Sequence, residues 1–372
     1  MINPEQLAVS GVRKLTPYQP GKPITELERE LGISNIVKLA SNENPLGPSP
    51  KALEAIQSGL GALHLYPDGG GFDLKSALAG KLGIEPAQIT LGNGSSEVLE
   101  LAVRTFVEPG LKVLFAEHSF AIYPILAQAV GATGVVAPAH DGTKGPRFGH
   151  DIKAMAEKVD PQTRLVFIAN PNNPTGTYLK EQELRWFLQV IPEHVIVVVD
   201  EAYCEYVCVP DYPNALEWLV DFPNLIVTRT FSKVYGLAGL RAGYAVSSFE
   251  IADLMNRIRP PFNVNSLALA AAAAALFDRE HLERSVRLNN EGMRTLCSAF
   301  LERGLPFIPS VGNFISFDVG RDALPVYQAL LREGVIVRPI ANYGLPDHLR
   351  VTVGTETENR LFLGALDRVM GL

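Results

Sequence analysis

Residues 225–243 read LIVTRTFSKVYGLAGLRAG, and this stretch carries the most informative pattern in the chain. The apolar residues at 225–227 predict a strand, hydroxyl side chains lead from it to Lys233, and Arg241 follows eight residues later. A lysine amine forms a Schiff base with an aldehyde, whereas hydroxyls and a guanidinium hold a phosphate by charge-assisted hydrogen bonds. The pattern therefore indicates a site for a phosphate-bearing aldehyde. A surface lysine beside a glycine-rich turn is the alternative.

The run VIVVVDEAY at 195–203 places a carboxylate at the end of a second predicted strand. Its aliphatic residues are typical of a strand buried on both faces of a parallel sheet, and ligands bind at the carboxyl ends of such strands. Asp200 can pair there with a pyridine nitrogen and keep it protonated, so that the ring accepts electrons. Tyr203 is placed to hydrogen-bond the ring's phenolic oxygen. The alternative is a helix N-cap aspartate followed by a core tyrosine.

The string NPNNPTG at 170–176 follows a third predicted strand at 164–169. Proline and glycine fix a turn here, and the Asn173 side chain can bond a second substituent of the same ring. Because these residue types are ordinary turn formers, a plain turn is the alternative. The complete string is much rarer than its parts, so it supports a ligand site at this strand end.

The string LGNGSSE at 91–97 opens a predicted helix with Gly94, Ser95 and Ser96. Backbone N–H groups and the helix dipole favour an anion at such an N-terminus, and a simple N-cap is equally compatible. The third glycine of a dinucleotide-binding fingerprint is missing, so a NAD dehydrogenase has no support. With Thr230, Ser232 and Arg241 completing a phosphate site, the four segments together point most simply to pyridoxal phosphate (PLP).

Composition excludes several other classes of protein. The 372 residues include 33 basic and 40 acidic ones, a net charge of −7, which gives no basic footprint for nucleic acid. Cys204 and Cys208 have no second pair of ligands at metal spacing, and the scattered histidines form no metal motif, so no metal site is expected. Three cysteines make no disulfide framework, and we find no signal peptide or membrane-spanning run, which predicts a cytoplasmic protein without a membrane partner.

The order of predicted elements indicates an α/β fold with two domains. A Pro- and Gly-rich N-terminal arm, residues 1–50, is expected to pack with the small domain. Residues 51–262 alternate helices and strands, which predicts a large α/β/α domain with a mainly parallel sheet. The texture changes after Pro260-Pro261, so residues 263–372 are expected to form a smaller α+β domain. Predicted strands lie at 112–116, 164–169, 195–199, 225–228, 313–319, 334–338 and 349–353. Predicted helices lie at 95–107, 120–130, 266–277, 323–333 and 356–370, and a long charged helix is expected to follow the one at 266–277 and to end at about 302.

In order and spacing, the four segments resemble the aspartate aminotransferase superfamily, the fold type I PLP enzymes. Four more strings resemble the histidinol-phosphate aminotransferases within it, and the resemblance covers essentially the whole chain. These strings are LTPY at 15–18, KLASNENPLGPSP at 38–50, YPD at 66–68 and LRVTVGT at 349–355. The resemblance implies a homodimeric enzyme of histidine biosynthesis that transaminates L-histidinol phosphate with 2-oxoglutarate, giving imidazole-acetol phosphate and L-glutamate.

The resemblance also implies a role for each site residue. Lys233 is the Schiff-base lysine, Asp200 the partner of the pyridine nitrogen, and Phe120 the ring that stacks on the cofactor; a core aromatic is the alternative for Phe120. Relatives often carry tyrosine there. Tyr66 reaches the cofactor phosphate of the partner subunit, unless it is only a surface turn residue. The implied contacts to the phenolic oxygen come from Tyr203 and Asn173, and those to the phosphate from Gly94, Ser95, Ser96, Thr230, Ser232 and Arg241.

The expected substrate site rests on Arg338 and Arg350. One pocket must accept the phosphate of histidinol phosphate and the carboxylates of glutamate in turn, and guanidinium groups suit both anions. For Arg338, a solvated arginine at a strand end is the alternative. The resemblance adds Tyr18, which would close the pocket from the arm, and Asn44.

Three other functions stay open at this point. An aromatic amino-acid aminotransferase would use the same arginine for a carboxylate, with a hydrophobic pocket for Phe or Tyr. A PLP-dependent lyase resembling threonine-phosphate decarboxylase would release carbon dioxide. A PLP-binding regulator would carry an additional DNA-binding domain, which the net charge does not favour.

Overall fold

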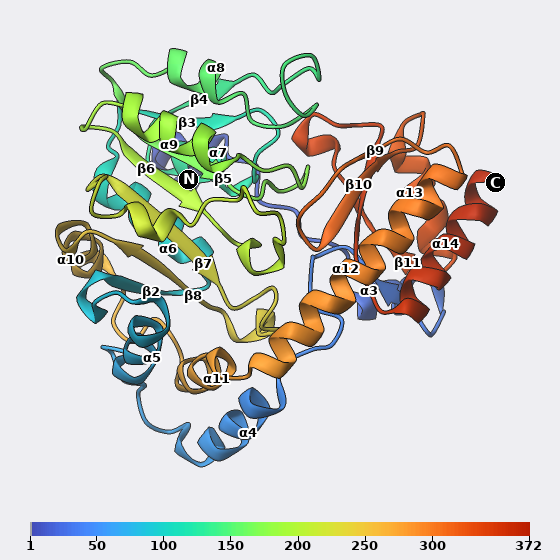
Figure 1. The fold of residues 1–372 in the computed structure, drawn as a ribbon, viewed down its shortest axis with the longest axis horizontal. Coiled ribbons are helices and arrows are strands. Elements are labelled where there is room, and N and C mark those ends of the chain that lie inside the picture. The colour runs from blue at the N-terminus through green and yellow to red at the C-terminus, as the bar shows by residue number, and fades with distance from the viewer. Residues whose placement is uncertain (1) are drawn as a thin grey trace.

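A seven-stranded sheet forms the centre of the larger part of the computed structural model, which describes residues 2–372 (Figure 1). Its strand order is β2-β8-β7-β6-β5-β3-β4. All neighbours are parallel except β8, which runs antiparallel to both β2 and β7. In that order the strands are Ile89–Asn93, Ala242–Ser247, Leu225–Thr230, Ile196–Asp200, Thr163–Ala169, Lys112–Ala116 and Thr133–Ala137. The prediction of a mainly parallel sheet is confirmed, and β2, β4 and β8 are strands that sequence reasoning missed.

Apolar residues on each face of this sheet pack under a separate set of helices. Along β6, Val197 and Val199 enter one core and Ile196 and Val198 enter the other, as the period of two in a strand requires. The first core lies under α4 (Pro50–Gly59), α5 (Phe72–Leu82), α8 (Ile152–Glu157), α9 (Glu181–Val190) and α11 (Ser266–Leu276). The second lies under α6 (Ser95–Phe106), α7 (Ile122–Ala129) and α10 (Phe249–Ile258). The continuous aliphatic run in β6 thus reflects burial on both faces.

A second sheet lies to the right in Figure 1, in orange and red, and is antiparallel with the order β12-β13-β10-β9. Its strands are Arg338–Pro339, His348–Thr352, Phe314–Asp318 and Phe307–Ile308. Helices α12 (Arg279–Glu302), α13 (Ala323–Arg332) and α14 (Glu356–Met370) enclose a core with its strands. The 24-residue helix α12 starts beside α11 and runs diagonally to this sheet, so it connects the two parts of the molecule.

The N-terminal arm contributes short elements to both parts. It contains α1 (Pro4–Leu7), α2 (Ser10–Arg13), α3 (Ile24–Leu31) and β1 (Val37–Lys38). Strand β1 pairs in parallel with β11 (Val335–Ile336), whereas α2 packs on α7 of the larger part. Single 3-10 turns complete the chain at Leu60–Ala62, Pro86–Gln88, Cys204–Tyr206, Ala215–Trp218, Ala238–Leu240 and Ala341–Tyr343.

Helix α11 falls within the range expected for the small domain but packs against the large sheet. Residues 263–372 were expected to form the small domain, but alanine side chains of α11 belong to the core of the large sheet, where α11 packs on α4 and α5. The small alanine side chains let α11 approach α4 and α5 closely. The composition of α11 does not reveal which of the two sheets it packs against. The division of the chain at residue 262 stays a prediction.

Candidate active site

A cavity of about 280 Å³ opens at the carboxyl ends of β5, β6 and β7. The last residues of these strands, Ala169, Asp200 and Thr230, lie on its wall, which is where an α/β sheet places ligands. The arm and the strands β12 and β13 close the opposite side. Its lining includes these predicted residues: Tyr18, Ser95, Ser96, Phe120, Asn173, Asp200, Tyr203, Thr230, Ser232, Lys233, Arg241, Arg338 and Arg350.

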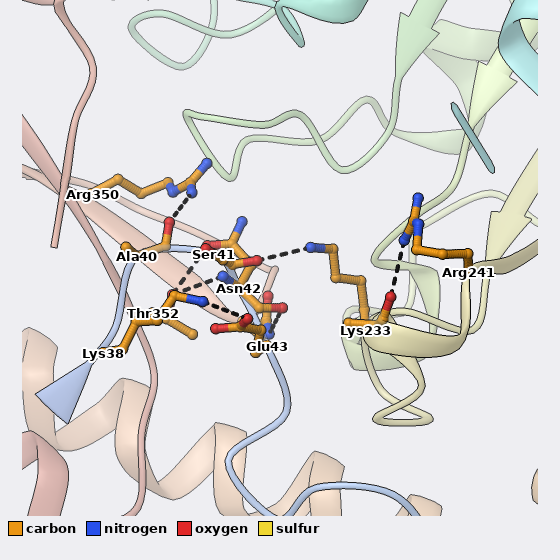
Figure 2. A network of polar contacts seen from close by, with 11 residues as sticks. Lys38, Ala40, Ser41, Asn42, Glu43, Lys233, Arg241, Arg350 and Thr352 are labelled. Atoms are coloured by element: carbon orange, nitrogen blue, oxygen red, sulfur yellow. Dashed lines mark hydrogen bonds and ion pairs between the residues drawn. The ribbon is translucent and has the colours of Figure 1, made fainter. Parts of the chain in front are cut away.

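Lys233 projects from the turn after β7 into this cavity (Figure 2). Its Nζ donates a hydrogen bond to the Ser41 carbonyl oxygen of the arm at 3.0 Å and lies 5.6 Å from the centre of the Tyr203 ring. Burial lowers the pKa of Lys233 to about 8, and the nearby cations Arg350 and Arg241 add to this effect. An amine of this kind is available as a nucleophile and as a base near neutral pH.

Asp200 is the last residue of β6 and is buried. Its Oδ2 accepts a hydrogen bond from the Tyr123 hydroxyl at 2.9 Å, and its Oδ1 accepts one from Thr228 Oγ1 at 3.2 Å. Burial raises the pKa of Asp200 to about 6, against the opposing effect of these hydrogen bonds. The alternative of a helix N-cap is wrong for Asp200, because the residue lies inside the strand and the next 3-10 turn has Tyr203 at its N-cap.

The Tyr203 hydroxyl meets a residue that sequence reasoning missed. Asn42, from the arm, donates its Nδ2 hydrogen to Tyr203 Oη at 2.9 Å and is held by two contacts with Thr352. Asn42 has a φ of +54°, a left-handed conformation that asparagine tolerates better than most residues. The Asn42–Tyr203 contact joins the arm to the strand ends of the large sheet.

Polar groups converge where the N-terminus of α6 meets the turn that follows Lys233. Gly94 has a φ of +82°, and a Cβ there would lie 2.3 Å from Nη2 of Arg241. A Cβ on Gly243 would likewise lie 2.3 Å from the Ser95 nitrogen. Only glycine permits these approaches. Arg241 Nη1 donates to Ser232 Oγ at 3.3 Å, so the guanidinium and the hydroxyls are gathered at the end of a helix, as an anion site requires.

Two residues frame the space between these groups and Asp200. Phe120 lies on the wall with its ring edge-on to Tyr123, at a centroid distance of 5.9 Å, and edge-on to Tyr18 at 6.3 Å. Asn173 follows β5, and its Oδ1 accepts a hydrogen bond from Arg350 Nη1. Its Nδ2 is thereby oriented as a donor, which suits a ring oxygen.

Arg338 and Arg350 lie directly opposite each other in the antiparallel pair of β12 and β13. Both are buried, and like charges at opposed positions destabilise a sheet. Arg350 Nη2 donates to the Ala40 carbonyl oxygen at 2.7 Å, and Arg338 Nη2 to the Gln19 carbonyl oxygen at 2.6 Å. The Nε of Arg350 has no partner among residues 2–372. This arrangement is what a site for a bound anion requires.

Gly94 does not itself line the cavity, although its neighbour Ser95 does, and two further predicted residues lie away from it. Asn44 does not line it, because its Nδ2 donates to the Val234 carbonyl oxygen at 2.7 Å and to Ser285 Oγ at 2.8 Å. The structure thus gives Asn44 a role in fixing the arm, and the contact expected with substrate has no support. Tyr66 is 83 % exposed and stacks on Phe262 at a centroid distance of 4.7 Å.

The donor set fits PLP. The hydroxyls, the guanidinium and the α6 N-terminus suit its phosphate, and the buried Asp200 carboxylate suits a protonated pyridine nitrogen. Among residues 2–372 no cluster of His, Cys, Asp and Glu side chains is placed to hold a metal ion. Within the same residues, every helix is too short or too polar to cross a membrane.

Sequence reasoning also missed Ser41, Tyr123 and Thr228. Ser41 acts through its backbone carbonyl oxygen, which no side-chain pattern reveals. Thr228 lies within a predicted strand and Tyr123 within a predicted helix, where both are typical core residues. The string at 38–50 contains two asparagines, and sequence reasoning selected Asn44 rather than Asn42.

Comparison with known proteins places the chain among the aminotransferases. The family model "Aminotransferase class I and II" matches residues 34–366. The chain is 66% identical over 364 residues to histidinol-phosphate aminotransferase 2 of Methylococcus capsulatus, covering 98% of both chains. It is 59% identical over 365 residues to histidinol-phosphate aminotransferase 1 of Nitrosococcus oceani, covering 98% of this chain and 97% of the relative.

A solved structure agrees with these relatives. The crystal structure of histidinol-phosphate aminotransferase from Sinorhizobium meliloti in complex with pyridoxal-5'-phosphate has a TM-score of 0.89 and 31% identity, covering 98% of this chain and 97% of that one. The sequence-based expectation of a fold type I aminotransferase is therefore confirmed. With the strand-end lysine and aspartate already in place around one cavity, the chain belongs to the class I and II aminotransferase family.

Proposed function

We propose that this protein is a PLP-dependent enzyme that transfers the amino group of L-histidinol phosphate to 2-oxoglutarate in histidine biosynthesis. One observation carries the proposal: Lys233 and Asp200 face the same cavity as two buried arginines, Arg338 and Arg350. The first two residues suit the cofactor chemistry and the arginines suit an anionic substrate. The relatives named histidinol-phosphate aminotransferase, at 59% and 66% identity, favour this substrate over an aromatic amino acid.

When bound, PLP supplies an aldehyde that takes up the amino group and a pyridine ring that accepts the electron pair released at the substrate Cα. Asp200, as a carboxylate, holds a proton on the ring nitrogen. Lys233 removes the Cα proton and delivers it to the C4′ atom, a transfer for which its lowered pKa of about 8 is suited. Lys233 thus carries the proton transfer, and its hydrogen bond to the Ser41 carbonyl oxygen supports a role for the arm in orienting it.

The remaining polar residues divide between cofactor and substrate. We assign the phosphate of PLP to Gly94, Ser95, Ser96, Thr230, Ser232 and Arg241, its phenolic oxygen to Tyr203 and Asn173, and its ring face to Phe120. Arg338 and Arg350 bind the phosphate of histidinol phosphate and the carboxylates of glutamate in alternate half-reactions, and Tyr18 closes the cavity. The edge contact between Tyr18 and Phe120, and the position of Arg338 5.8 Å from the Tyr18 ring, support this division.

We also propose that the protein is cytoplasmic and that it forms a homodimer. In this dimer Tyr66 contacts the phosphate of the PLP bound in the partner subunit. The 83 % exposed Tyr66 ring and the exposed Phe262 ring on which it stacks support this idea, because a partner subunit that covered this pair would remove both rings from water. Asp68 accepts hydrogen bonds from the backbone nitrogens of Gly70 and Phe72, which fixes the loop that carries Tyr66. Sedimentation of the wild-type protein and of Tyr66→Phe, with PLP affinity measured on both, tests it.

A single-turnover experiment tests the reaction and the substrate together. The PLP form of the protein is mixed with histidinol phosphate, and the visible absorbance of the bound cofactor is followed. We expect conversion to the pyridoxamine form and restoration on addition of 2-oxoglutarate. Conversion by phenylalanine or tyrosine without conversion by histidinol phosphate would move the assignment to an aromatic aminotransferase, and release of carbon dioxide would identify a lyase.

A further inference from the structure

Tyr123 is a fully buried tyrosine whose hydroxyl points at the proposed partner of the pyridine nitrogen. It lies in the first turn of α7, and its hydroxyl donates to Asp200 Oδ2 at 2.9 Å. Thr228, on the neighbouring strand β7, donates to Asp200 Oδ1 at 3.2 Å. Each carboxylate oxygen therefore has one hydroxyl donor, and the two donors come from different elements.

The Tyr123 ring itself packs against two other aromatic residues. It stacks on Phe167 of β5 at a centroid distance of 4.3 Å and an interplanar angle of 7°. Phe120 also meets it, edge-on, at 5.9 Å and 86°. A fully buried ring with two aromatic contacts has little freedom to rotate, so the hydrogen bond of its hydroxyl to Asp200 is preorganised.

We propose that Tyr123 and Thr228 are positioning residues that hold the Asp200 carboxylate in its ionised form and aim it at the cofactor ring nitrogen. This inference deepens the proposed function and rests on it. Neither residue lines the cavity, so both act through Asp200. Because an ionised carboxylate accepts hydrogen bonds at both oxygens, two hydroxyl donors favour the charged form over the acid.

The charges around Asp200 explain why such donors are needed. Burial is the main factor that raises the pKa of Asp200 to about 6, and the neighbouring Glu201 adds to it. Glu201 is paired with Arg229, whose Nη2 lies 2.7 Å from its Oε2. On the cavity side, the facing titratable groups are Lys233 and Tyr203.

One further titratable group approaches from the neighbouring strand. His150 bonds to the Ala169 carbonyl oxygen at 3.0 Å, and Ala169 is the partner of Asp200 in the register of β5 and β6. Burial lowers the pKa of His150 to about 4, so this ring is neutral at the pH where Asp200 titrates. The hydroxyls of Tyr123 and Thr228 are thus the direct side-chain donors to Asp200.

The test measures the equilibrium dissociation constant of PLP against pH for the full-length protein. As the pH is lowered, we expect the affinity to fall first as Lys233 becomes protonated near pH 8 and again as Asp200 becomes protonated near pH 6. Tyr123→Phe should move the second fall, that of Asp200, upward by about 1 pH unit. This change deletes one oxygen and keeps the ring that contacts Phe120 and Phe167. Tyr178→Phe is the matched control. Tyr178 donates a hydrogen bond of 2.8 Å to the Asp211 carboxylate, and neither residue lines the cavity.

The holoenzyme provides a second measurement of the pH at which Asp200 becomes protonated. The rate of the half-reaction with histidinol phosphate in Tyr123→Phe should fall off at a higher pH than in the wild-type protein, with Tyr178→Phe unchanged. A uniform loss of affinity or rate at every pH would indicate a merely structural role for Tyr123 and would overturn the proposal. Profiles that match the wild type would overturn it too.

Thr228 provides an independent variant if Tyr123→Phe does not fold. Thr228→Val should move the pH profile in the same direction, and Thr228→Ser, which keeps the hydroxyl, should restore it. If Thr228→Val and Thr228→Ser share the wild-type profile, Asp200 does not depend on this donor and the inference fails. Failure of the proposed function has a different signature, because the wild-type protein itself would then show no transamination of histidinol phosphate.

Discussion

The two sides of the cavity are built in different ways. The side on the large sheet takes Asp200, Lys233 and Arg241 from strand ends and turns that follow one another closely in the chain. The opposite side brings together the arm and two strands of the small sheet, where Arg338 and Arg350 bond to carbonyl oxygens of Gln19 and Ala40. Arg338 and Gln19 lie 319 residues apart in sequence, and Arg350 and Ala40 lie 310 residues apart.

This difference separates chemistry from substrate choice. A rigid sheet buried on both faces fixes the residues proposed to act on the cofactor, which is the precision that proton transfer needs. The arm and the strands β12 and β13 carry the residues proposed to contact the substrate. We therefore expect variants on the sheet side to affect both half-reactions alike, and variants on the arginine side to change the ratio between substrates.

The largest effect is expected for Lys233→Ala. Because this variant removes the base that moves the Cα proton, both half-reactions should slow by about 10³-fold or more. Rapid-mixing measurements with histidinol phosphate and with glutamate check this, and Lys180→Ala, a change at an exposed lysine paired with Asp211, is the control. Substantial turnover by Lys233→Ala would contradict the assignment of the lysine.

Conservative changes at the arginines should have the next largest effect. Arg350→Lys and Arg338→Lys keep the charge and lose the planar fork, so kcat/KM should fall by about 10- to 100-fold, the value of one charge-assisted contact. The loss should differ between histidinol phosphate and glutamate, because a phosphate and a carboxylate use the fork differently. Equal losses for both substrates would remove the distinction between the two sides.

Gly94→Ala tests the phosphate end of the sheet side. A Cβ at a φ of +82° and 2.3 Å from the Arg241 guanidinium must displace that group, so PLP should bind about 10-fold more weakly. Gly110→Ala is a matched control, since its φ is +93° and no atom lies within 4 Å of the added Cβ. Titration of PLP binding separates the two, and a similar loss in both variants would leave only backbone strain as the cause.

The smallest expected effect is a shift in the pH dependence of Lys233, on the sheet side of the cavity, when Arg350 on the opposite side is changed. Only the unprotonated amine of Lys233 attacks an aldehyde, so the rate of PLP capture should rise with pH and reach half its maximum near pH 8. Arg350→Gln removes a cation that lowers the pKa of Lys233 and should move this midpoint to higher pH. A midpoint that does not respond would show that the arginine side leaves Lys233 unaffected.

The sequence predicted the sheet side well, because its signals are local. A β6 strand that is apolar at every position before Asp200 reveals both the strand and the buried carboxylate, and the turn after β7 reveals Lys233. The antiparallel strand β8 was missed, since Ala242 and Gly243 lack the β-branched residues that mark a strand. Their small size serves the close approach to Ser95, which is a tertiary requirement.

On the arginine side the sequence determined which residue types were available, and the tertiary structure decided which of them meet. Asn42 and Asn44 stand two positions apart in one string, yet Asn42 bonds to Tyr203 and Asn44 bonds to Ser285 of α12. Similarly, nothing near Tyr123 in sequence indicates that its hydroxyl reaches Asp200. Strand ends and glycine turns follow from local chemistry, whereas a side chain's partner depends on how distant elements pack, and this packing is fixed only in the folded chain.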